Sequence, residues 1–231
     1  MIIASATTIL DGTKNVDPSR TLIYTKARPD GASILKTEEF MPELQRCPWC
    51  GTDPLYLSYH DKEWGSPVHD EGLHFEFLLL ETMQAGLSWR CVLGKREAFR
   101  QAFDGFDAGK VAAYTGAKIE SLLQNQGIIR NRKKIEGAVK NAKAFLRTAE
   151  EFGSFDAYIW SWTCGKPLVN RWRSMDEVPA RSPLSDALAA DMKKRGYSFV
   201  GSTTLYAHLQ AIGVINDHLL HCFRWKELSA L

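Results

Sequence analysis

The amino-acid sequence predicts an all-α fold. Apolar side chains recur at helical spacing in many stretches, and strand-like alternation is scarce, with only Tyr197 to Val200 resembling a strand. The composition, 45% hydrophobic and 24% charged, is typical of an ordinary globular protein. At 231 residues the chain suffices for one large domain or two small ones. We find no internal repeat or low-complexity tract.

The chain is expected to divide into three parts. Residues 1–46 carry scattered polar residues without a sustained period, so we interpret them as an N-terminal extension whose order the composition leaves open. The main domain is predicted over 47–225, followed by a short tail over 226–231. Within the domain, 47–68 is rich in Pro, Gly, Asp and aromatic residues without periodicity. This segment is predicted to be loop-rich and well packed.

Helices are predicted from residue 71 onward. Between Glu71 and Met83 the side chains are apolar nearly all round, which predicts a buried helix that ends near Gly86. A stripe of apolar residues at helical spacing, Ile135, Val139, Ala142 and Leu146, predicts another helix. Ser185 is the expected N-cap of a helix over 184–194. Further helices are predicted over 95–103, 117–125, 154–162, 203–212 and 216–223.

Charge and cysteine content narrow the class of protein. The net charge of +2 does not require an acidic partner, so any nucleic-acid surface must be local. Five cysteines in a chain of this size do not suggest a disulfide scaffold and fit a reducing compartment. The N-terminus lacks the plan of a secretory signal, and the longest apolar run, Phe75 to Leu80, is too short to span a bilayer. We therefore expect a soluble, cytoplasmic protein without a membrane partner.

Two pairs of residues are candidate metal ligands. Cys47 and His60 lie thirteen positions apart, and His218 and Cys222 lie four apart in a predicted helix. Four positions along a helix place two side chains on one face, with Cβ atoms about 6 Å apart. Thiolate and imidazole ligands favour zinc, and four protein ligands leave no open position. The site would be structural and would clip the two ends of the domain together.

Spacing alone leaves other assignments open. An isolated Cys or His is usually a packed or solvated residue. Cys47 and Cys50 form a C-x-x-C motif, which suits either a redox pair or two zinc ligands. His221 is adjacent to Cys222, but neighbouring helical residues point about 100° apart.

Glu81 is a carboxylate within the apolar helix 71–83. Such burial is costly unless the group is paired or used. An acidic group beside aromatic faces suits a flat, cationic, hydrogen-bond-donating ligand such as an alkylated purine base. The alternatives are an ion pair or a backbone cap for Glu81, and a structural core for the rings. The aromatic residues within forty positions are Trp49, Tyr56, Tyr59, Trp64 and Trp89.

A basic segment begins at a tight turn. The segment from Gly127 to Ile135 is flanked by helical patterns, and from Gly127 to Arg147 seven basic residues oppose one acid, a local charge of +6. Backbone N–H groups at a helix start, with Lys and Arg beside them, suit a DNA phosphate. A solvated helix face is an equally supported interpretation.

Six runs of the sequence together resemble the bacterial 3-methyladenine DNA glycosylase I family. They occur in one order between about Cys47 and about Phe223, which is far more specific than any single motif. No counterpart is recognised for residues 1–46. The runs are Cys47–Trp49, Asp53–Gly65, Leu80–Trp89, Gly127–Arg132, Lys193–Gly201 and Val214–His218.

The resemblance implies a helix-hairpin-helix DNA glycosylase fold with one structural zinc ion. Its ligands would be Cys47, His60, His218 and Cys222, which sets Cys50 and His221 aside. Glu81 would be the carboxylate of the catalytic site and would recognise the damaged base. The rings around that base would be Trp49, Tyr59 and Trp89, supported by Tyr56 and Trp64. The DNA contacts would come from a plug, Gly86 and Leu87, and from the hairpin region with Gly127, Arg130, Arg132 and Lys133.

The expected activity is excision of 3-methyladenine from alkylated double-stranded DNA by hydrolysis of the N-glycosidic bond. The nucleotide would be flipped out of the stack, and water would attack an oxocarbenium-like sugar. Glu81 would read the base, stabilise that sugar or orient the water; the sequence leaves these roles open. The family does not rely on the catalytic Asp of its superfamily, so Asp156 is given no role. No Lys nucleophile is evident at the hairpin, which implies a monofunctional enzyme.

Two alternatives come from other classes of protein. One is a zinc-containing DNA-binding protein without catalysis. The other is a thiol redox enzyme using Cys47 and Cys50, which is disfavoured because no βαβ pattern surrounds that motif. The enzyme is expected to be a monomer, with alkylated DNA and the released 3-methyladenine as its partners.

Overall fold

The computed structural model describes residues 22–27, 33–38 and 44–230. The chain divides into two compact units, Met1–Leu44 and Gln45–Leu231. In the first unit, β1 (Leu22–Ala27) pairs antiparallel with β2 (Ser33–Glu38), with Leu22 opposite Glu38. The sequence analysis predicted no strand here. The rest of the expectation for residues 1–46 lies mostly outside the described residues.

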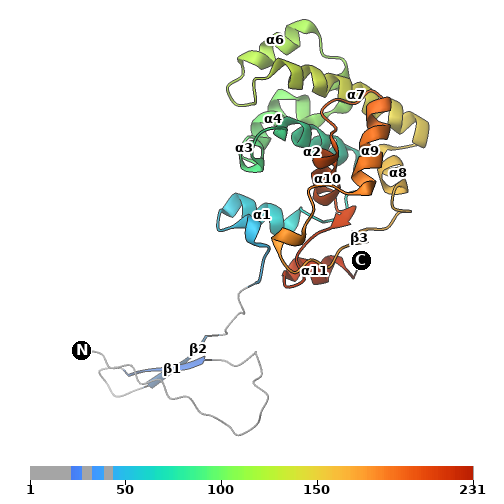
Figure 1. The fold of residues 1–231 in the computed structure, drawn as a ribbon. Coiled ribbons are helices and arrows are strands. Elements are labelled where there is room, and N and C mark those ends of the chain that lie inside the picture. Colours follow the sequence, from blue (N-terminus) through green and yellow to red (C-terminus); the bar gives the residue numbers. More distant parts are fainter. Residues whose placement is uncertain (1–21, 28–32, 39–43, 231) are drawn as a thin grey trace. The chain divides into compact units, whose positions relative to one another are not determined.

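The second unit is helical, as predicted (Figure 1). Its two short strands pair in parallel, with Leu168 opposite Ile215. The expected strand at 197–200 is wrong, since these residues form the loop after a helix. The elements are η1 (Pro48–Cys50), α1 (Pro54–Lys62), α2 (Glu71–Gln84), α3 (Trp89–Leu93), α4 (Arg96–Ala102), η2 (Asp104–Phe106), α5 (Ala108–Ala112), α6 (Gly116–Gln124), α7 (Arg132–Phe152), α8 (Phe155–Ser161), β3 (Leu168–Val169), η3 (Met175–Glu177), α9 (Pro183–Lys194), α10 (Ser202–Ala211), β4 (Ile215–Asn216) and α11 (Phe223–Leu228).

Two segments differ from their predicted structure. The segment 47–68, expected to be loop-rich, contains α1, because Asp53 caps the helix by accepting a hydrogen bond from the Leu55 N–H and Pro54 fits its first turn. The predicted helix 216–223 is also wrong. Asn216 instead ends β4, and α11 begins only at Phe223, because residues 215–216 pair with β3.

Two smaller expectations also need correction. The N-cap of α9 is Ser182. Ser185 is the third residue of the helix and forms a reciprocal capping box with Ser182. On α7, Leu146 is 42% exposed, so it does not belong to the buried stripe. That stripe instead continues through Phe145. Helices α3 and α5 were not predicted, since five residues are too few to establish a period.

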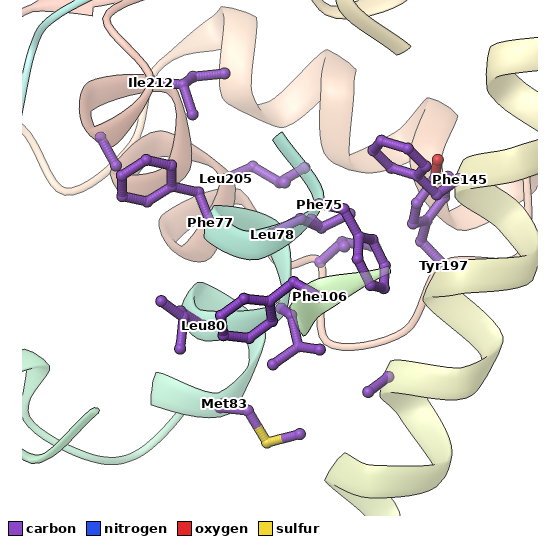
Figure 2. Close-up of a cluster of buried hydrophobic side chains, with 14 of the residues drawn as sticks. Phe75, Phe77, Leu78, Leu80, Met83, Phe106, Phe145, Tyr197, Leu205 and Ile212 are labelled. Atoms are coloured by element: carbon purple, nitrogen blue, oxygen red, sulfur yellow. The ribbon is translucent and has the colours of Figure 1, made fainter. Parts of the chain in front are cut away.

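Helix α2 forms the centre of the hydrophobic core. Because its side chains are apolar almost all round, it is buried against α7, α8 and α10 at once. Figure 2 shows Phe75 and Leu78 of this helix close to Phe145 of α7 and Leu205 of α10. Asp70 caps its start by accepting from the Leu73 N–H. This central position holds the last turn of α2 firmly in place.

A buried lysine donates hydrogen bonds to the backbone carbonyls at the C-terminal end of α2. Lys134 of α7 is 7% exposed, and its Nζ atom donates to the carbonyl oxygens of Met83 at 2.7 Å and Ala85 at 2.6 Å. The last carbonyls of a helix lack partners within the helix, so a lysine there completes the end. Gly86 follows with a φ of 77° and turns the chain away from the helix axis.

The chain ahead of α2 lies directly against the end of α10. A Cβ atom on Gly213 would lie 2.3 Å from the carbonyl carbon of Ser66, so only glycine fits there. The Gly65 N–H donates to the Gln210 carbonyl at 3.0 Å. Segments far apart in the sequence thereby form one wall. No helix in the described part of the chain is long and apolar enough to cross a membrane.

Candidate active site and metal centre

A cavity of about 300 Å³ opens between α2, α10 and the segment around α1. It brings together Glu81 and four of the five predicted aromatic residues, which come from η1, α1, the turn after α1, and α3. The lining residues are Trp49, Tyr59, Trp64, Glu81, Gln84, Trp89, Met175, Val178, Pro179, Ala180, Thr203, Tyr206, Ala207, Gln210 and Asp217.

The aromatic rings of the cavity pack mainly edge to face. The ring centroids of Trp49 and Trp64 are 5.0 Å apart at 72°, and those of Tyr59 and Trp89 are 5.4 Å apart at 49°. Tyr56 does not line this cavity. Its ring packs at 83° against Trp49, 5.8 Å away, and it borders a neighbouring depression. The structure therefore places Tyr56 behind the wall that Trp49 forms.

Glu81 is a buried carboxylate that has no counter-ion among the described residues. It is 4% exposed, and its Oε2 atom has no hydrogen-bond partner within the described residues. Burial raises the pKa of Glu81 to about 8, since the charged form loses its hydration. Neither an ion pair nor a backbone cap, the two alternatives for Glu81, is formed with any described residue. The acceptor is thus available to a ligand.

Two indole N–H groups of the cavity are also buried without a hydrogen-bond partner among the described residues. The Nε1 atoms of Trp49 and Trp89 are buried and have no acceptor in the described part of the chain. Buried polar groups are usually hydrogen-bonded, and each exception calls for an explanation. One acceptor and two donors around a single aromatic cavity fit a planar ligand with polar edges, because such a ligand would satisfy them.

Helix α10 provides a wall of the cavity that was not predicted. Its lining residues, Thr203, Tyr206, Ala207 and Gln210, recur at positions i, i+3, i+4 and i+7. This spacing marks one face of a helix, and it was legible in the sequence. The predicted helix 203–212 carries no Asp, Glu, Lys or Arg, so it was not predicted to line a site.

Asp217 also lines the cavity and was missed as a site residue. It is 1% exposed and accepts four hydrogen bonds. Its Oδ1 atom accepts from Asn170 Nδ2 at 2.6 Å and Trp172 Nε1 at 2.7 Å, while Oδ2 accepts from Tyr206 OH at 2.6 Å and Gln210 Nε2 at 2.7 Å. Asp217 therefore joins the segment after β3 to α10.

The four predicted metal ligands meet at one point. All are buried, and their ligand atoms lie within 4.8 Å of one another. Cys222 Sγ is 3.4 Å from His60 Nε2 and 3.4 Å from His218 Nδ1, and Cys47 Sγ is 3.6 Å from His218 Nδ1. Two thiols and two imidazoles at these separations match the donor set and size of a tetrahedral site.

Neighbouring groups orient both imidazoles toward the sulfur atoms. His60 Nδ1 lies 2.8 Å from Asp61 Oδ1, and Asp61 is in turn held by Arg46. His218 Nε2 lies 2.9 Å from the Trp64 carbonyl oxygen and donates to it. Partners of this kind fix the ring orientation of metal-binding histidines. The pKa of the Cys222 thiol is lowered by a hydrogen bond from Cys47, which favours the thiolate.

The alternative ligands do not join this cluster. The Cys50 thiol donates to the Cys47 carbonyl oxygen at 3.0 Å, and His221 is exposed. Cys47 and Cys50 are both free thiols, with no disulfide between them.

The predicted DNA-contacting residues lie in two loops. Gly86 and Leu87 follow α2 and are exposed, Leu87 by 42%. The loop from Asn125 to Asn131 joins α6 to α7, and Asn125 accepts from the Gly127 N–H at 2.8 Å. Lys95 holds the same loop by donating to the Gly127 carbonyl at 3.2 Å.

The basic residues near this loop divide into three groups. Arg130 and Lys133 are exposed and form no ion pair with any described residue. Arg132 is paired with Glu120 at 2.7 Å. Lys134 is buried at the end of α2, so the prediction that it belongs to a basic surface is wrong.

Comparison with known proteins gives consistent matches over the second unit. The model of the family described as methyladenine glycosylase matches residues 49–225. DNA-3-methyladenine glycosylase of Haemophilus influenzae is 47% identical over 177 residues, covering 77% of this chain and 96% of that protein. A crystal structure of 3-methyladenine DNA glycosylase I is 48% identical, with a TM-score of 0.75 over 78% of this chain and 98% of that one. The Staphylococcus aureus enzyme, studied for its recognition of 3-methyladenine, is 35% identical, with a TM-score of 0.76 over 78% and 96%.

Proposed function

The chain belongs to the methyladenine glycosylase family, and we propose on this basis that it is a DNA repair glycosylase. It excises 3-methyladenine from alkylated double-stranded DNA by hydrolysing the N-glycosidic bond. The observation that carries the proposal is Glu81, a buried carboxylate that no other described residue pairs with, in a cavity walled by aromatic rings. The family match and the identity to enzymes of this activity support it.

The substrate explains why such a site suffices. Methylation at N3 gives adenine a positive charge, and the base leaves as a neutral molecule, so little acid catalysis is needed. The flipped base lies against the rings of Trp49, Tyr59 and Trp89 and donates hydrogen bonds to Glu81. The positive charge of the base lowers the pKa of Glu81 in the complex and keeps the carboxylate ionised. Tyr56 and Trp64 support the aromatic wall.

The DNA lies along the two loops described above. α6, the loop from 125 to 131 and α7 form the hairpin of a helix-hairpin-helix fold, and backbone N–H groups of this loop ahead of α7 face a phosphate. Arg130, Lys133 and, once released from Glu120, Arg132 add positive charge. Gly86 and Leu87 fill the gap left by the flipped nucleotide. No lysine nucleophile takes part, so the enzyme is monofunctional.

Cys47, His60, His218 and Cys222 hold one structural zinc ion. The chemistry of this donor set and the orienting partners of both imidazoles support the assignment. Zinc would supply a cross-link between the two ends of the domain over 47–225, and no open position for catalysis. Trp49 and Tyr59 each lie within two residues of a ligand, so the cluster keeps both rings in place.

A product assay tests the proposal. Methylated duplex DNA is incubated with the full chain, and the released bases are identified by chromatography. We expect 3-methyladenine to be released and the abasic strand to stay intact. Asp156→Asn should keep this activity, because Asp156 accepts a hydrogen bond from His74 and lies outside the cavity. It is therefore the control for substitution of the carboxylate Glu81. Binding of methylated DNA without base release would instead indicate a non-catalytic DNA-binding protein.

Two expectations from the sequence belong to the same proposal. The enzyme is expected to act in the cytoplasm. It is also expected to be a monomer, because it must surround bent DNA. Gel filtration with and without duplex DNA measures the second of these, and elution as a dimer in both conditions would contradict it.

A further inference from the structure

Phe199 combines two unfavourable features. Its side chain is 37% exposed, and its backbone adopts a φ of 60°, in the left-handed region that disfavours residues with a Cβ atom. Among the described residues it is the only large apolar side chain with both properties. Backbone strain of this kind persists only where surrounding contacts enforce it, and it is a reason to look for a function.

Several contacts hold the loop of Phe199 in this conformation. Asn141 of α7 clamps the preceding residue, since its Oδ1 atom accepts from the Ser198 N–H at 2.7 Å and its Nδ2 atom donates to the Ser198 carbonyl at 3.1 Å. Tyr197 is buried, and its hydroxyl donates to Thr148 at 3.0 Å. The loop is therefore fixed on α7, and the exposed ring is presented from a rigid base.

A glycine on α7 makes room for the ring. A Cβ atom on Gly137 would lie 2.9 Å from the Cδ2 and Cε2 atoms of Phe199, closer than side chains tolerate. Gly137 is also buried in the interior of a 21-residue helix, where glycine is unfavourable. The sequence thus accepts a poor helix residue at the point where the Phe199 ring rests.

The ring lies among the elements proposed to hold DNA. Lys133 and Lys140 are one helical turn to either side of Gly137, are exposed, and form no ion pair in the described part of the chain. Lys134, also one turn away, reaches Ala85, next to the Gly86–Leu87 plug. Four residues after Phe199, Thr203 lines the cavity. An exposed ring flanked by unpaired cations complements a strand of DNA.

We propose that Phe199 packs against duplex DNA beside the flipped nucleotide, as a second apolar contact in addition to Leu87. Lys133 and Lys140 then contact phosphates on either side of the ring. The inference rests on the proposed function for its partner, double-stranded DNA. Apolar side chains that touch sugars and base edges are a recurrent device of proteins that deform DNA. The strained turn fixes the ring before binding, so less side-chain freedom is lost on the DNA.

The test uses Phe199→Gly in the full chain. Glycine adopts a φ of 60° without strain, so the strain that is relieved offsets the packing that is lost with the ring. Binding is measured by fluorescence anisotropy on duplex DNA containing a stable abasic-site analogue, and in parallel for free 3-methyladenine. We expect duplex affinity to fall about tenfold, as burial of a large apolar side chain implies. Affinity for the free base and the melting temperature should not fall.

Two further variants sharpen the result. Gly137→Ala displaces the ring and should weaken duplex binding in the same way. Leu146→Ala removes an exposed apolar side chain elsewhere on α7 and should leave duplex binding unchanged. Lys140→Gln should lower the slope of log affinity against log salt by about one, whereas Phe199→Gly should not change that slope.

The proposal is overturned if Phe199→Gly binds the duplex within twofold of the wild type, or if it loses free-base binding equally. Duplex binding is read out separately from base release. Failure of the wild-type chain to release 3-methyladenine would therefore contradict the proposed function, and not the contact by Phe199.

Discussion

The Nε2 atom of His60 lies 3.4 Å from the Sγ atom of Cys222, although 162 positions separate the two residues in the sequence. His60 is on α1 and Cys222 immediately precedes α11, so the contact joins the two ends of the domain. Trp64, whose carbonyl oxygen accepts from the second histidine of the cluster, lines the cavity. The proposed metal centre and the proposed base site thus share one piece of backbone.

Loss of a metal ligand should weaken both the fold and the wall of the cavity. We expect one zinc ion per purified chain, and its loss in Cys222→Ser, with the melting temperature lowered by about 10 °C. Atomic spectrometry and thermal denaturation measure these quantities. Cys50→Ser is the matched control, because Cys50 lies outside the cluster. A fully loaded Cys222→Ser variant would show that Cys222 is not a ligand.

Glu81→Gln should impair excision severely. The amide keeps the size of the side chain but loses the negative charge that faces the cationic base. We expect single-turnover release of 3-methyladenine to slow by about 100-fold or more. Affinity for the free base measured in parallel separates reading of the base from catalysis, since a purely catalytic role would leave that affinity intact. An unchanged release rate would exclude both roles.

The same substitution should change how stability depends on pH. The pKa of Glu81 is raised from 4.5 to about 8 in the folded protein, so the folded state binds this proton more tightly than the unfolded state does. The resulting stability is present in full below pH 4.5 and is lost as the pH rises through about 8. Relative to Glu81→Gln, the wild type should lose at most about 5 kcal/mol across this range. Urea denaturation at several pH values checks this, and parallel pH profiles would contradict it.

Lys134→Met should affect the protein through the end of α2. The change removes two hydrogen bonds and leaves the Met83 and Ala85 carbonyls without their donor. We expect the free energy of unfolding to fall by about 1–3 kcal/mol. Excision should fall further than binding of the free base, because the plug at Gly86 and Leu87 loses its anchor. Equal losses in both assays would indicate a purely structural role.

Asp217→Asn should disrupt the α10 wall. Four donors now face the Asp217 carboxylate, and an amide nitrogen would oppose two of them. We expect a loss of stability of about 2–4 kcal/mol, as for a broken buried network. Tyr206→Phe removes only one of the four donors and should cost about 1 kcal/mol. The proposed hub would be refuted by an Asp217→Asn variant that unfolds at the wild-type denaturant concentration.

The elements that the sequence predicts well are those with strong periodicity. Helix α2 was located almost to the residue because its apolar residues surround it. Helix α1 was missed because its buried residues, such as Tyr59 and His60, serve the cavity and the metal cluster instead of forming an apolar stripe. Apolar periodicity could not reveal α1, although Asp53 followed by Pro54 is a local signal for the start of a helix.

The structure brings the four predicted metal ligands together, although the reason given for one pair was wrong. His218 and Cys222 were paired because a helix would place them on one face, but the chain there is β4 and a loop. Their ring and sulfur atoms meet nonetheless, at 3.4 Å. The spacing on α10 marked a helix face, but it could not show that this face and Asp217 line the cavity of Glu81. That placement depends on the pairing of β3 with β4 and on the close approach at Gly213.

The order in which the chain is synthesised gives the cavity a further property. One wall comes from residues 49–89 and the opposite wall from residues 203–217. In the sequence, helices α4 to α9 lie between these two segments. A nascent chain emerges from the ribosome N-terminus first, so Glu81 and its aromatic neighbours are available well before Asp217. Until the last third of the domain has emerged, the carboxylate has no enclosed cavity around it. The ability to enclose a base therefore arises late in synthesis, after the residues proposed to contact DNA have been made.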